Sequence, residues 1–189
     1  MKSLILASAS PRRREILDKM GVAYEVIPST GDEALDLSLP LTEGVIQVAK
    51  AKAEEVASAH PDRLVLGADT VVAIDGQVLG KPQDEEDAFA MLSSLQGRWH
   101  QVLTGVWVTS PDGGRGFASV AEVCFYPLTA QEIRDYIATG EPMDKAGSYG
   151  IQGLGMRFVK EMRGDYYNVM GLPGGELWRF LQTFPDFHS

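Results

Sequence analysis

Residues 4–17, LILASASPRRREIL, constrain the fold most, because an apolar run stops at small hydroxyl residues and a helical pattern begins at once. The apolar part predicts a short buried strand over residues 3–8. Ser10, Pro11 and Gly21 predict a helix from about residue 11 to residue 20, since they suit its N-cap, first turn and C-terminal stop. A helix that follows a strand so closely is typical of α/β folds.

Strands and helices alternate along the rest of the chain. Strand patterns cover residues 23–28, both sides of Asp75-Gly76 within 63–82, and both sides of the PDGG stretch within 100–128. Helical patterns cover residues 42–59, 84–95, 129–140 and 174–184, and residues 157–173 predict a final hairpin. Hairpins among helices favour a mixed sheet. We predict a single α/β domain over residues 1–189, folded as one body or as two lobes around a cleft.

Composition excludes several classes of protein. The net charge of -9 argues against a protein that binds nucleic acid polymers or anionic membranes through a broad basic surface. No apolar run approaches the length of a membrane span. The one cysteine, Cys124, lies in the apolar run VCFY, which predicts a buried, inert thiol and fits a reducing cytoplasm. We expect a cytoplasmic protein.

Several common catalytic motifs are missing from the sequence. It contains no G-x-G-x-x-G after a strand and no G-x-x-x-x-G-K-[ST], which removes the main support for dinucleotide-binding and Walker-type sites. It also lacks H-E-x-x-H, C-x-x-C and G-x-S-x-G, so zinc sites and serine hydrolases have no support either.

Two cations lie on helix faces that are otherwise apolar. Arg13 shares a stripe with Ile16, Leu17 and Met20, and Lys52 shares one with apolar residues of the second helix. Long side chains can reach water past the edge of a core, and Lys52 or Arg13 alone would be explained in that way. Two such cations favour an anion pocket. A bound polyphosphate would also explain three arginines in a first helical turn, where the helix dipole disfavours positive charge.

Carboxylates complete this set of candidate residues. Asp69 interrupts the apolar run LVLGADTVVAI, which is explained either by an aspartate that backbone N–H groups satisfy or by a functional carboxylate. Lys81 follows the Asp75-Gly76 hairpin, and Glu33 lies in a polar loop. Cations that hold phosphates, together with carboxylates that bind a divalent metal or accept a proton from water, suit hydrolysis of a phosphoric anhydride.

Six stretches together resemble the Maf family of nucleotide pyrophosphatases: SASPRRREIL, GADTVV, GKP, VLTGV, GEPMDKAGSYGIQG and GDYYNVMGLP. The resemblance runs from Ser3 to about Pro173, in the family's order and spacing. It implies a fold related to inosine triphosphatases, with an elongated mixed sheet, flanking helices and two lobes around a central cleft. It also implies a homodimer and hydrolysis of a nucleoside triphosphate to the monophosphate and pyrophosphate, with Mg²⁺ or Mn²⁺.

The resemblance also implies roles for individual residues. Asp69 matches the family's catalytic proton acceptor. The residues that match its substrate pocket are Ser8, Arg12, Arg13, Glu33, Lys52 and Lys81. From this resemblance we expect Ser8, Arg13, Lys52 and Lys81 to bind phosphate, and Glu33 with Asp69 to bind the metal. Water would attack the α-phosphorus, with Asp69 as base, metal ligand or both.

The sequence also resembles one branch of the family more than the other. GADT and YGIQG are similar to the dTTP/UTP pyrophosphatases and differ from the branch that acts on 7-methyl-GTP. The specificity positions then fall on Arg12, Thr70 and Gln152. The Gln152 amide has a donor and an acceptor, which match the N3–H and O4 edge of thymine or uracil. The alternatives are 7-methyl-GTP as substrate, or a nucleotide sensor of cell division that does not hydrolyse its ligand.

Two stretches keep more than one interpretation. The backbone N–H groups of DKAGSYGIQG suit phosphate binding, but its glycines suit turns of a plain surface loop equally well. The aromatic side chains of DYYN suit stacking on a base, although the alternation expected for a strand favours packing in a core or an interface.

Overall fold

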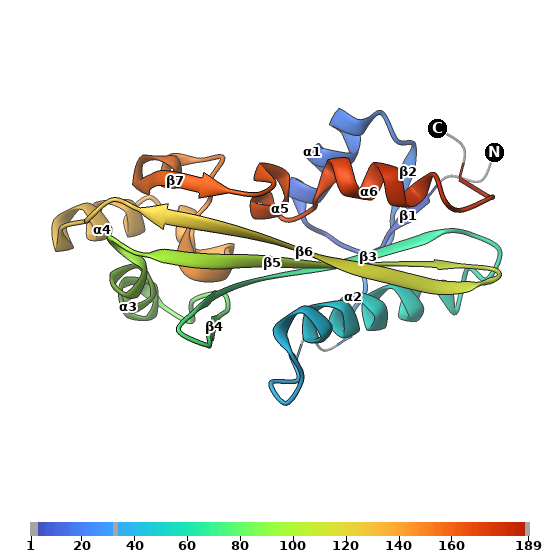
Figure 1. Ribbon diagram of the computed structural model, residues 1–189, viewed down its shortest axis with the longest axis horizontal. Helices are drawn as coiled ribbons and strands as arrows, with labels where there is room; N and C mark the ends of the chain where they lie inside the picture. The colour runs from blue at the N-terminus through green and yellow to red at the C-terminus, as the bar shows by residue number, and fades with distance from the viewer. Residues whose placement is uncertain (1–3, 32–33, 188–189) are drawn as a thin grey trace. The chain divides into compact units, whose positions relative to one another are not determined.

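The structure is a computed structural model that describes residues 4–31 and 34–187, and it is built on one seven-stranded sheet (Figure 1). The strand order is β2-β1-β3-β5-β6-β7, and β4 pairs with β3. β1 is parallel to β2 and β3, whereas β3 with β4 and β6 with β7 are antiparallel. The predicted mixed sheet is therefore confirmed. The strands are β1 (Leu4–Leu6), β2 (Tyr24–Val26), β3 (Val65–Ile74), β4 (Gln77–Leu79), β5 (Trp99–Ser110), β6 (Gly113–Phe125) and β7 (Val159–Arg163).

Helices alternate with these strands along the chain. The α-helices are α1 (Pro11–Met20), α2 (Leu41–Ala57), α3 (Glu85–Leu95), α4 (Ala130–Ile137), α5 (Tyr166–Met170) and α6 (Gly174–Leu181). Three short 3₁₀ helices lie between α4 and β7: η1 (Glu141–Asp144), η2 (Ala146–Ser148) and η3 (Leu154–Phe158). Among the described helices, none is both long and apolar enough to cross a membrane.

The chain divides into two compact units. The first comprises the described parts of Met1–Thr70 and Gly171–Ser189 together with Thr104–Ser119. The second comprises Val71–Leu103 and Val120–Met170. Strands β3, β5 and β6 contribute residues to both units. Two units fit the predicted two lobes, while a cleft between them stays a prediction.

In the first unit, α2 covers one face of β3, and α1 and α6 lie over the other (Figure 1). Small residues bring α2 close to the sheet, and the buried side chains between them form one cluster: Ile5, Ala7, Ala53, Val56, Ala57 and Val65. On the other face, Ile16 of α1 and Leu177 of α6 are buried almost completely. Both faces of β3 are thus covered, which explains why its residues are nearly all apolar.

In the second unit, α3, α4, η1 and η2 pack together. An aromatic cluster forms much of its core. The rings of His100, Phe125 and Tyr149 meet edge to face, and Phe158 contacts both Phe125 and Tyr136. Edge-to-face pairs of this kind stabilise a core beyond the area that they bury.

Most predicted elements are confirmed within one to three residues. Ser10 caps α1 and Gly21 ends it in the left-handed conformation, and Thr129 with Glu132 forms the predicted capping box of α4. Asp75 and Gly76 both have positive φ, as the predicted tight hairpin between β3 and β4 requires. Cys124 is buried.

The hairpin predicted for residues 157–173 is wrong. β7 pairs with β6, which is distant in the sequence, and it ends at Arg163, just before Gly164, where φ is +100°. Asp165 then accepts a hydrogen bond from the Tyr167 backbone N–H (2.7 Å), and the helix α5 begins. Tyr166 and Tyr167 therefore lie on a helix, partly exposed, and do not alternate on a strand in the core.

Candidate active site

A buried ion pair joins α2 to β3 in the first unit. The Lys52 Nζ lies 2.9 Å from the Asp69 Oδ1, and the two side chains are 6% and 13% exposed. Gly67, two residues before Asp69 on the same face, lets the helix approach. A Cβ at Gly67 would lie 2.1 Å from the Ala49 carbonyl oxygen. The predicted inward direction of Lys52 is confirmed, and each charge has the partner that burial demands.

Arg13 is held by a second set of contacts, also within the first unit. Its Nε donates to the Gly171 carbonyl (2.9 Å), one terminal nitrogen to the Ser8 hydroxyl (3.1 Å) and the other to the Thr70 hydroxyl (3.2 Å). The Thr70 hydroxyl also lies 2.9 Å from that of Thr104. These acceptors are neutral oxygens, so the contacts orient the guanidinium without adding negative charge beside it.

The two sets of contacts lie on opposite faces of β3. Asp69 and Thr70 are successive residues of this strand, so their side chains point in opposite directions. Asp69 faces Lys52 of α2, and Thr70 faces Arg13 of α1. A phosphate chain that contacted both the Lys52–Asp69 pair and Arg13 would have to cross from one face of β3 to the other at Asp69 and Thr70.

The remaining predicted residues lie elsewhere. Arg12 is half-buried in the first turn of α1. Lys81, just after β4, and Gln152, in the turn before η3, are exposed and belong to the second unit. Glu33 lies outside the described residues, so its predicted place in the site is untested. The structure thus brings together Lys52 with Asp69, and Ser8 with Arg13 and Thr70.

Backbone N–H groups of the glycine-rich segment already have partners within the second unit. The Gly150 N–H donates to the Tyr136 hydroxyl (3.1 Å). The Leu154 and Gly155 N–H groups donate to the Glu141 carboxylate (2.9 and 3.1 Å). These three groups are therefore occupied by the protein, which disfavours them as phosphate ligands.

Four contributors to these contacts were not predicted. Thr104 and the Gly171 carbonyl complete the environment of Thr70 and Arg13, and Tyr136 and Glu141 hold the segment around Gln152. The one signal for Thr104 was a hydroxyl residue within the apolar run VLTGV. A backbone carbonyl leaves no signal in a sequence.

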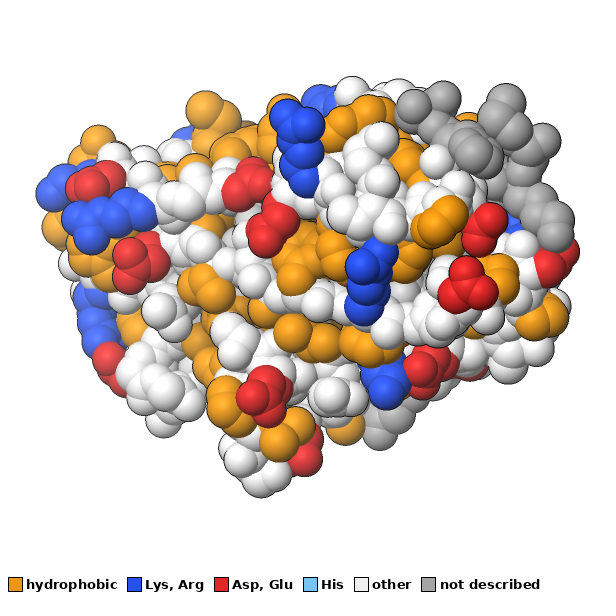
Figure 2. Space-filling view, turned by 45° about the vertical axis from the view of Figure 1, so that its right-hand side comes forward, with side chains coloured by type: hydrophobic (Ala, Val, Ile, Leu, Met, Phe, Trp, Pro, Cys, Tyr) orange, Lys and Arg blue, Asp and Glu red, His pale blue; other side chains and the backbone are white. Residues whose placement is uncertain are grey.

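The charges of this acidic protein are mixed on the face in Figure 2. Among the coloured residues of that face, Lys and Arg side chains stand in small, separate groups between acidic and hydrophobic ones. This distribution agrees with the net charge of -9, and the coloured residues of that face form no broad basic surface.

In the described part of the chain, Asp69 does not belong to a cluster of metal-binding side chains. Within residues 4–31 and 34–187, no three His, Cys, Asp or Glu side chains gather in a way that could hold a metal ion. Mg²⁺ is commonly bound by one or two carboxylates with substrate phosphates and water. A single carboxylate such as Asp69 is compatible with that mode of binding.

Comparison with known proteins identifies close relatives. A family model described as Maf-like protein matches residues 3–184. A dTTP/UTP pyrophosphatase of Bacillus pumilus is 50% identical over 184 residues, which are 97% of each chain. A dTTP/UTP pyrophosphatase of Halalkalibacterium halodurans is 52% identical over 183 residues, which are 97% of this chain and 96% of that one.

Solved structures show more distant likenesses. The Staphylococcus aureus Ham1 protein has a TM-score of 0.44 at 18% identity, over 66% of this chain and 72% of that one. A nucleoside-triphosphatase, a dITP/XTP pyrophosphatase from Mycobacterium abscessus, has a TM-score of 0.40 at 16% identity, over 65% and 72%.

Proposed function

This chain belongs to the Maf family, and on that premise we propose that it hydrolyses dTTP and UTP to the nucleoside monophosphate and pyrophosphate. Relatives about half identical over nearly the whole chain carry that name. The observation that supports catalysis, and not binding alone, is the buried pair of Lys52 with Asp69. A carboxylate beside the cation repels phosphate, so a protein that only binds phosphate would be better served by a neutral acceptor for the buried Lys52.

In the proposed reaction, Asp69 accepts a proton from the water that attacks the α-phosphorus. The bond from that phosphorus to the oxygen bridging it to the β-phosphorus breaks, and pyrophosphate leaves. Lys52 holds the Asp69 carboxylate in place through its 2.9 Å contact. Arg12, Arg13 and Lys81 neutralise the phosphate chain and the charge that grows on the leaving group.

A divalent cation, Mg²⁺ or Mn²⁺, is part of this proposal. Asp69 would be its ligand from the described residues, and Glu33 is the further candidate. When bound, the cation would screen phosphate charge and polarise the oxygens that it contacts. The chemistry of one carboxylate beside phosphate-binding cations supports Mg²⁺.

Base selection is assigned to Arg12, Thr70 and Gln152. The Thr70 hydroxyl contacts Arg13 and Thr104, so we propose that it acts by orienting the Arg13 guanidinium. Gln152 is exposed in its turn. Its amide can donate to O4 and accept from N3–H of a thymine or uracil ring.

Pyrophosphate release from a panel of nucleotides tests the activity. The purified chain is incubated with Mg²⁺ and dTTP, UTP, CTP, GTP or 7-methyl-GTP, and pyrophosphate is measured against orthophosphate. We expect pyrophosphate, with dTTP and UTP turned over fastest. Preference for 7-methyl-GTP would move the chain to the other branch. Nucleotide binding without pyrophosphate would instead favour a sensor.

Two matched aspartate variants test the assignment of the base. Asp69→Asn removes the carboxylate charge at nearly constant volume, and we expect turnover to fall by at least about 100-fold, the size of a general-base effect. Asp75→Asn makes the same change at an exposed hairpin residue whose side chain is 68% exposed, and it should leave turnover unchanged. Near-normal turnover of the Asp69→Asn variant would refute the role.

We further propose a cytoplasmic homodimer. The single cysteine, Cys124, is buried and supports a reducing compartment. The homodimer rests on the family resemblance. Light scattering of the purified chain tests it, with the mass of two chains as the expected result.

A further inference from the structure

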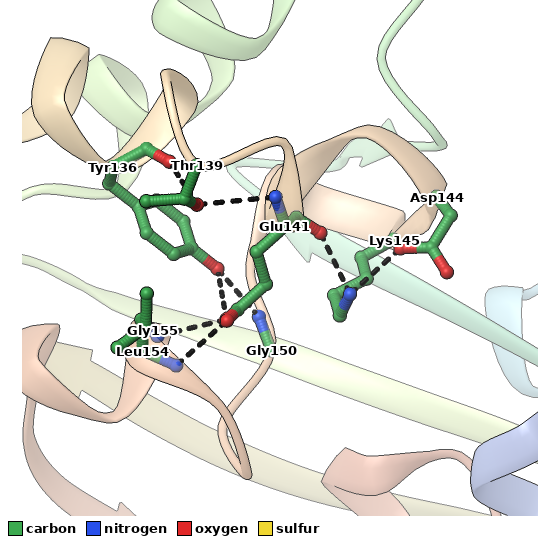
Figure 3. A network of polar contacts seen from close by, with 8 residues as sticks. All are labelled: Tyr136, Thr139, Glu141, Asp144, Lys145, Gly150, Leu154 and Gly155. Carbon is green, nitrogen blue, oxygen red and sulfur yellow. Dashed lines mark hydrogen bonds and ion pairs between the residues drawn. The ribbon is translucent and has the colours of Figure 1, made fainter.

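Glu141, at the start of η1, accepts hydrogen bonds from a segment that follows it by more than ten residues (Figure 3). Its Oε2 accepts from the Leu154 N–H (2.9 Å), and its Oε1 accepts from the Gly155 N–H (3.1 Å) and the Tyr136 hydroxyl (2.8 Å). The Tyr136 hydroxyl accepts in turn from the Gly150 N–H (3.1 Å). One carboxylate and one phenol thus bind the backbone on both sides of Gln152.

Two glycines of this segment, Gly153 and Gly155, leave room for the same contacts. A Cβ at Gly153 would lie 2.5 Å from the Glu141 Oε2. A Cβ at Gly155 would lie 2.7 Å from the Gly150 carbonyl oxygen and 2.9 Å from the Tyr136 hydroxyl. The glycines at 153 and 155 in YGIQGLG therefore reflect close packing against Glu141, Tyr136 and the backbone of the segment itself, and not the freedom of a flexible loop.

Further contacts hold Glu141 itself. Its N–H donates to the Thr139 hydroxyl (3.2 Å), and its carbonyl accepts from the Lys145 ammonium (2.7 Å), which also contacts Asp144 (2.7 Å). Desolvation acts to raise the Glu141 pKa, but the hydrogen bonds from Leu154, Gly155 and Tyr136 and the charge of Lys145 lower it overall. Burial raises the pKa of Tyr136, so this phenol stays protonated and can donate.

Resting on the proposed function, we propose that Glu141 and Tyr136 are positioning residues for base selection, which act by fixing the turn that carries Gln152. Gln152 lies between the backbone anchored at Gly150 and that anchored at Leu154 and Gly155. An amide that must match both a donor and an acceptor on a base discriminates only if its backbone is held before the ligand arrives.

Substitution of Glu141 by Gln should disturb this arrangement while keeping its shape. A carboxylate only accepts hydrogen bonds, whereas the NH₂ of a glutamine would face at least one of the donors that now point at Glu141. Tyr136→Phe removes the phenol from the Gly150 N–H, but it keeps the ring that packs on Phe158.

The test measures kcat and KM for dTTP and for dCTP, which differ on the edge that Gln152 would read. We expect Glu141→Gln and Tyr136→Phe to reduce the preference for dTTP at least 10-fold, mainly through a higher KM for dTTP, with kcat changed less than 3-fold. Glu132→Gln is the matched control, because the Glu132 carboxylate also accepts two hydrogen bonds, both from Thr129 in the capping box of α4. This control should keep the wild-type preference.

A double variant separates positioning from a general loss of structure. If Glu141 acts through Gln152, then Glu141→Gln should cause little further loss of preference in a chain that already carries Gln152→Ala. Equal losses in both backgrounds would overturn the inference, as would an unchanged preference in both Glu141→Gln and Tyr136→Phe.

The wild-type enzyme distinguishes failure of this inference from failure of the proposed function. A wild-type chain that does not release pyrophosphate from dTTP overturns the function and the inference together. A wild-type chain that prefers dTTP, alongside variants that keep the preference, overturns the inference alone. Should Glu141→Gln fail to fold, Tyr136→Phe carries the test.

Discussion

Removing one partner of the buried Lys52–Asp69 pair affects stability more than removing one partner of a surface pair does. Both side chains are removed from water, and each would be costly to bury alone. A surface pair such as Lys19 with Glu15, whose side chains are 53% and 46% exposed, contributes little. Loss of one partner of an ion pair is therefore expected to lower the free energy of unfolding much more at the buried pair than at the surface pair.

We expect Lys52→Met to lower the free energy of unfolding by about 3 kcal/mol, because the Asp69 charge is left without its partner. The matched control, Lys19→Met, should change it by no more than about 0.5 kcal/mol. Urea unfolding followed by circular dichroism measures both. The double variant Lys52→Met with Asp69→Asn should lose less than the sum of the two single variants. Strictly additive losses would contradict the pairing.

Prediction for single residues succeeded where the helical period alone decides whether a side chain points into the core. Arg13 and Lys52 are buried, as their positions on apolar stripes predicted. The partners of Thr70 could not be predicted in the same way. Besides Arg13, they come from β5 and from the residue that follows α5, separated from Thr70 by 34 and 101 residues. Contacts of this kind depend on the order of the strands in the sheet, which the local sequence pattern does not specify.

At the scale of elements, the approach of α2 to the sheet decides where Lys52 lies. Gly67 on β3 and Gly105 on β5 are the points of closest approach. A Cβ on Gly105 would lie 2.2 Å from the Val45 carbonyl oxygen, and one on Gly67 would lie 2.1 Å from that of Ala49. Helix backbone fills both positions, so the helix itself would have to move to admit a methyl group.

We expect Gly67→Ala to destabilise the protein by about 1–3 kcal/mol, the usual cost of overpacking, and to lower turnover because α2 carries Lys52. Gly175→Ala is the control, since Gly175 in α6 has open space where its Cβ would lie. It should be neutral or stabilising by up to about 1 kcal/mol. Thermal unfolding and pyrophosphate release measure the two effects. Wild-type behaviour of Gly67→Ala would contradict the close contact.

Elements were predicted well where capping and turn residues mark their ends, as in α1, α4 and the β3–β4 hairpin. Prediction failed after β7, because its antiparallel partner is β6 and not the residues that follow it. The network around Glu141 was also beyond prediction. Its glycines have the same sequence signature as a flexible loop, and only their contacts show that they are packed.

For the molecule as a whole, His100 makes stability depend on pH. Its ring is 2% exposed, and its Nε2 lies 2.8 Å from the Tyr149 hydroxyl, whereas its Nδ1 has no hydrogen-bond partner in the described part of the chain. Desolvation by burial lowers its pKa from 6.5 to about 4. A charged ring would bury a second N–H without an acceptor, so the folded protein keeps it neutral.

The sign of the effect follows from these two pKa values. Between pH 6.5 and about 4, His100 is protonated in the unfolded chain but neutral in the folded chain. The contribution of His100 to the free energy of unfolding is therefore complete above pH 6.5 and decreases as the pH falls. We expect His100→Gln to remove about 2 kcal/mol of the difference in unfolding free energy between pH 7 and pH 5. Urea unfolding at both pH values measures it. His60→Gln, at a residue that is only half-buried, should keep the wild-type difference. If His100→Gln and wild type lost the same amount, other groups would carry the pH dependence.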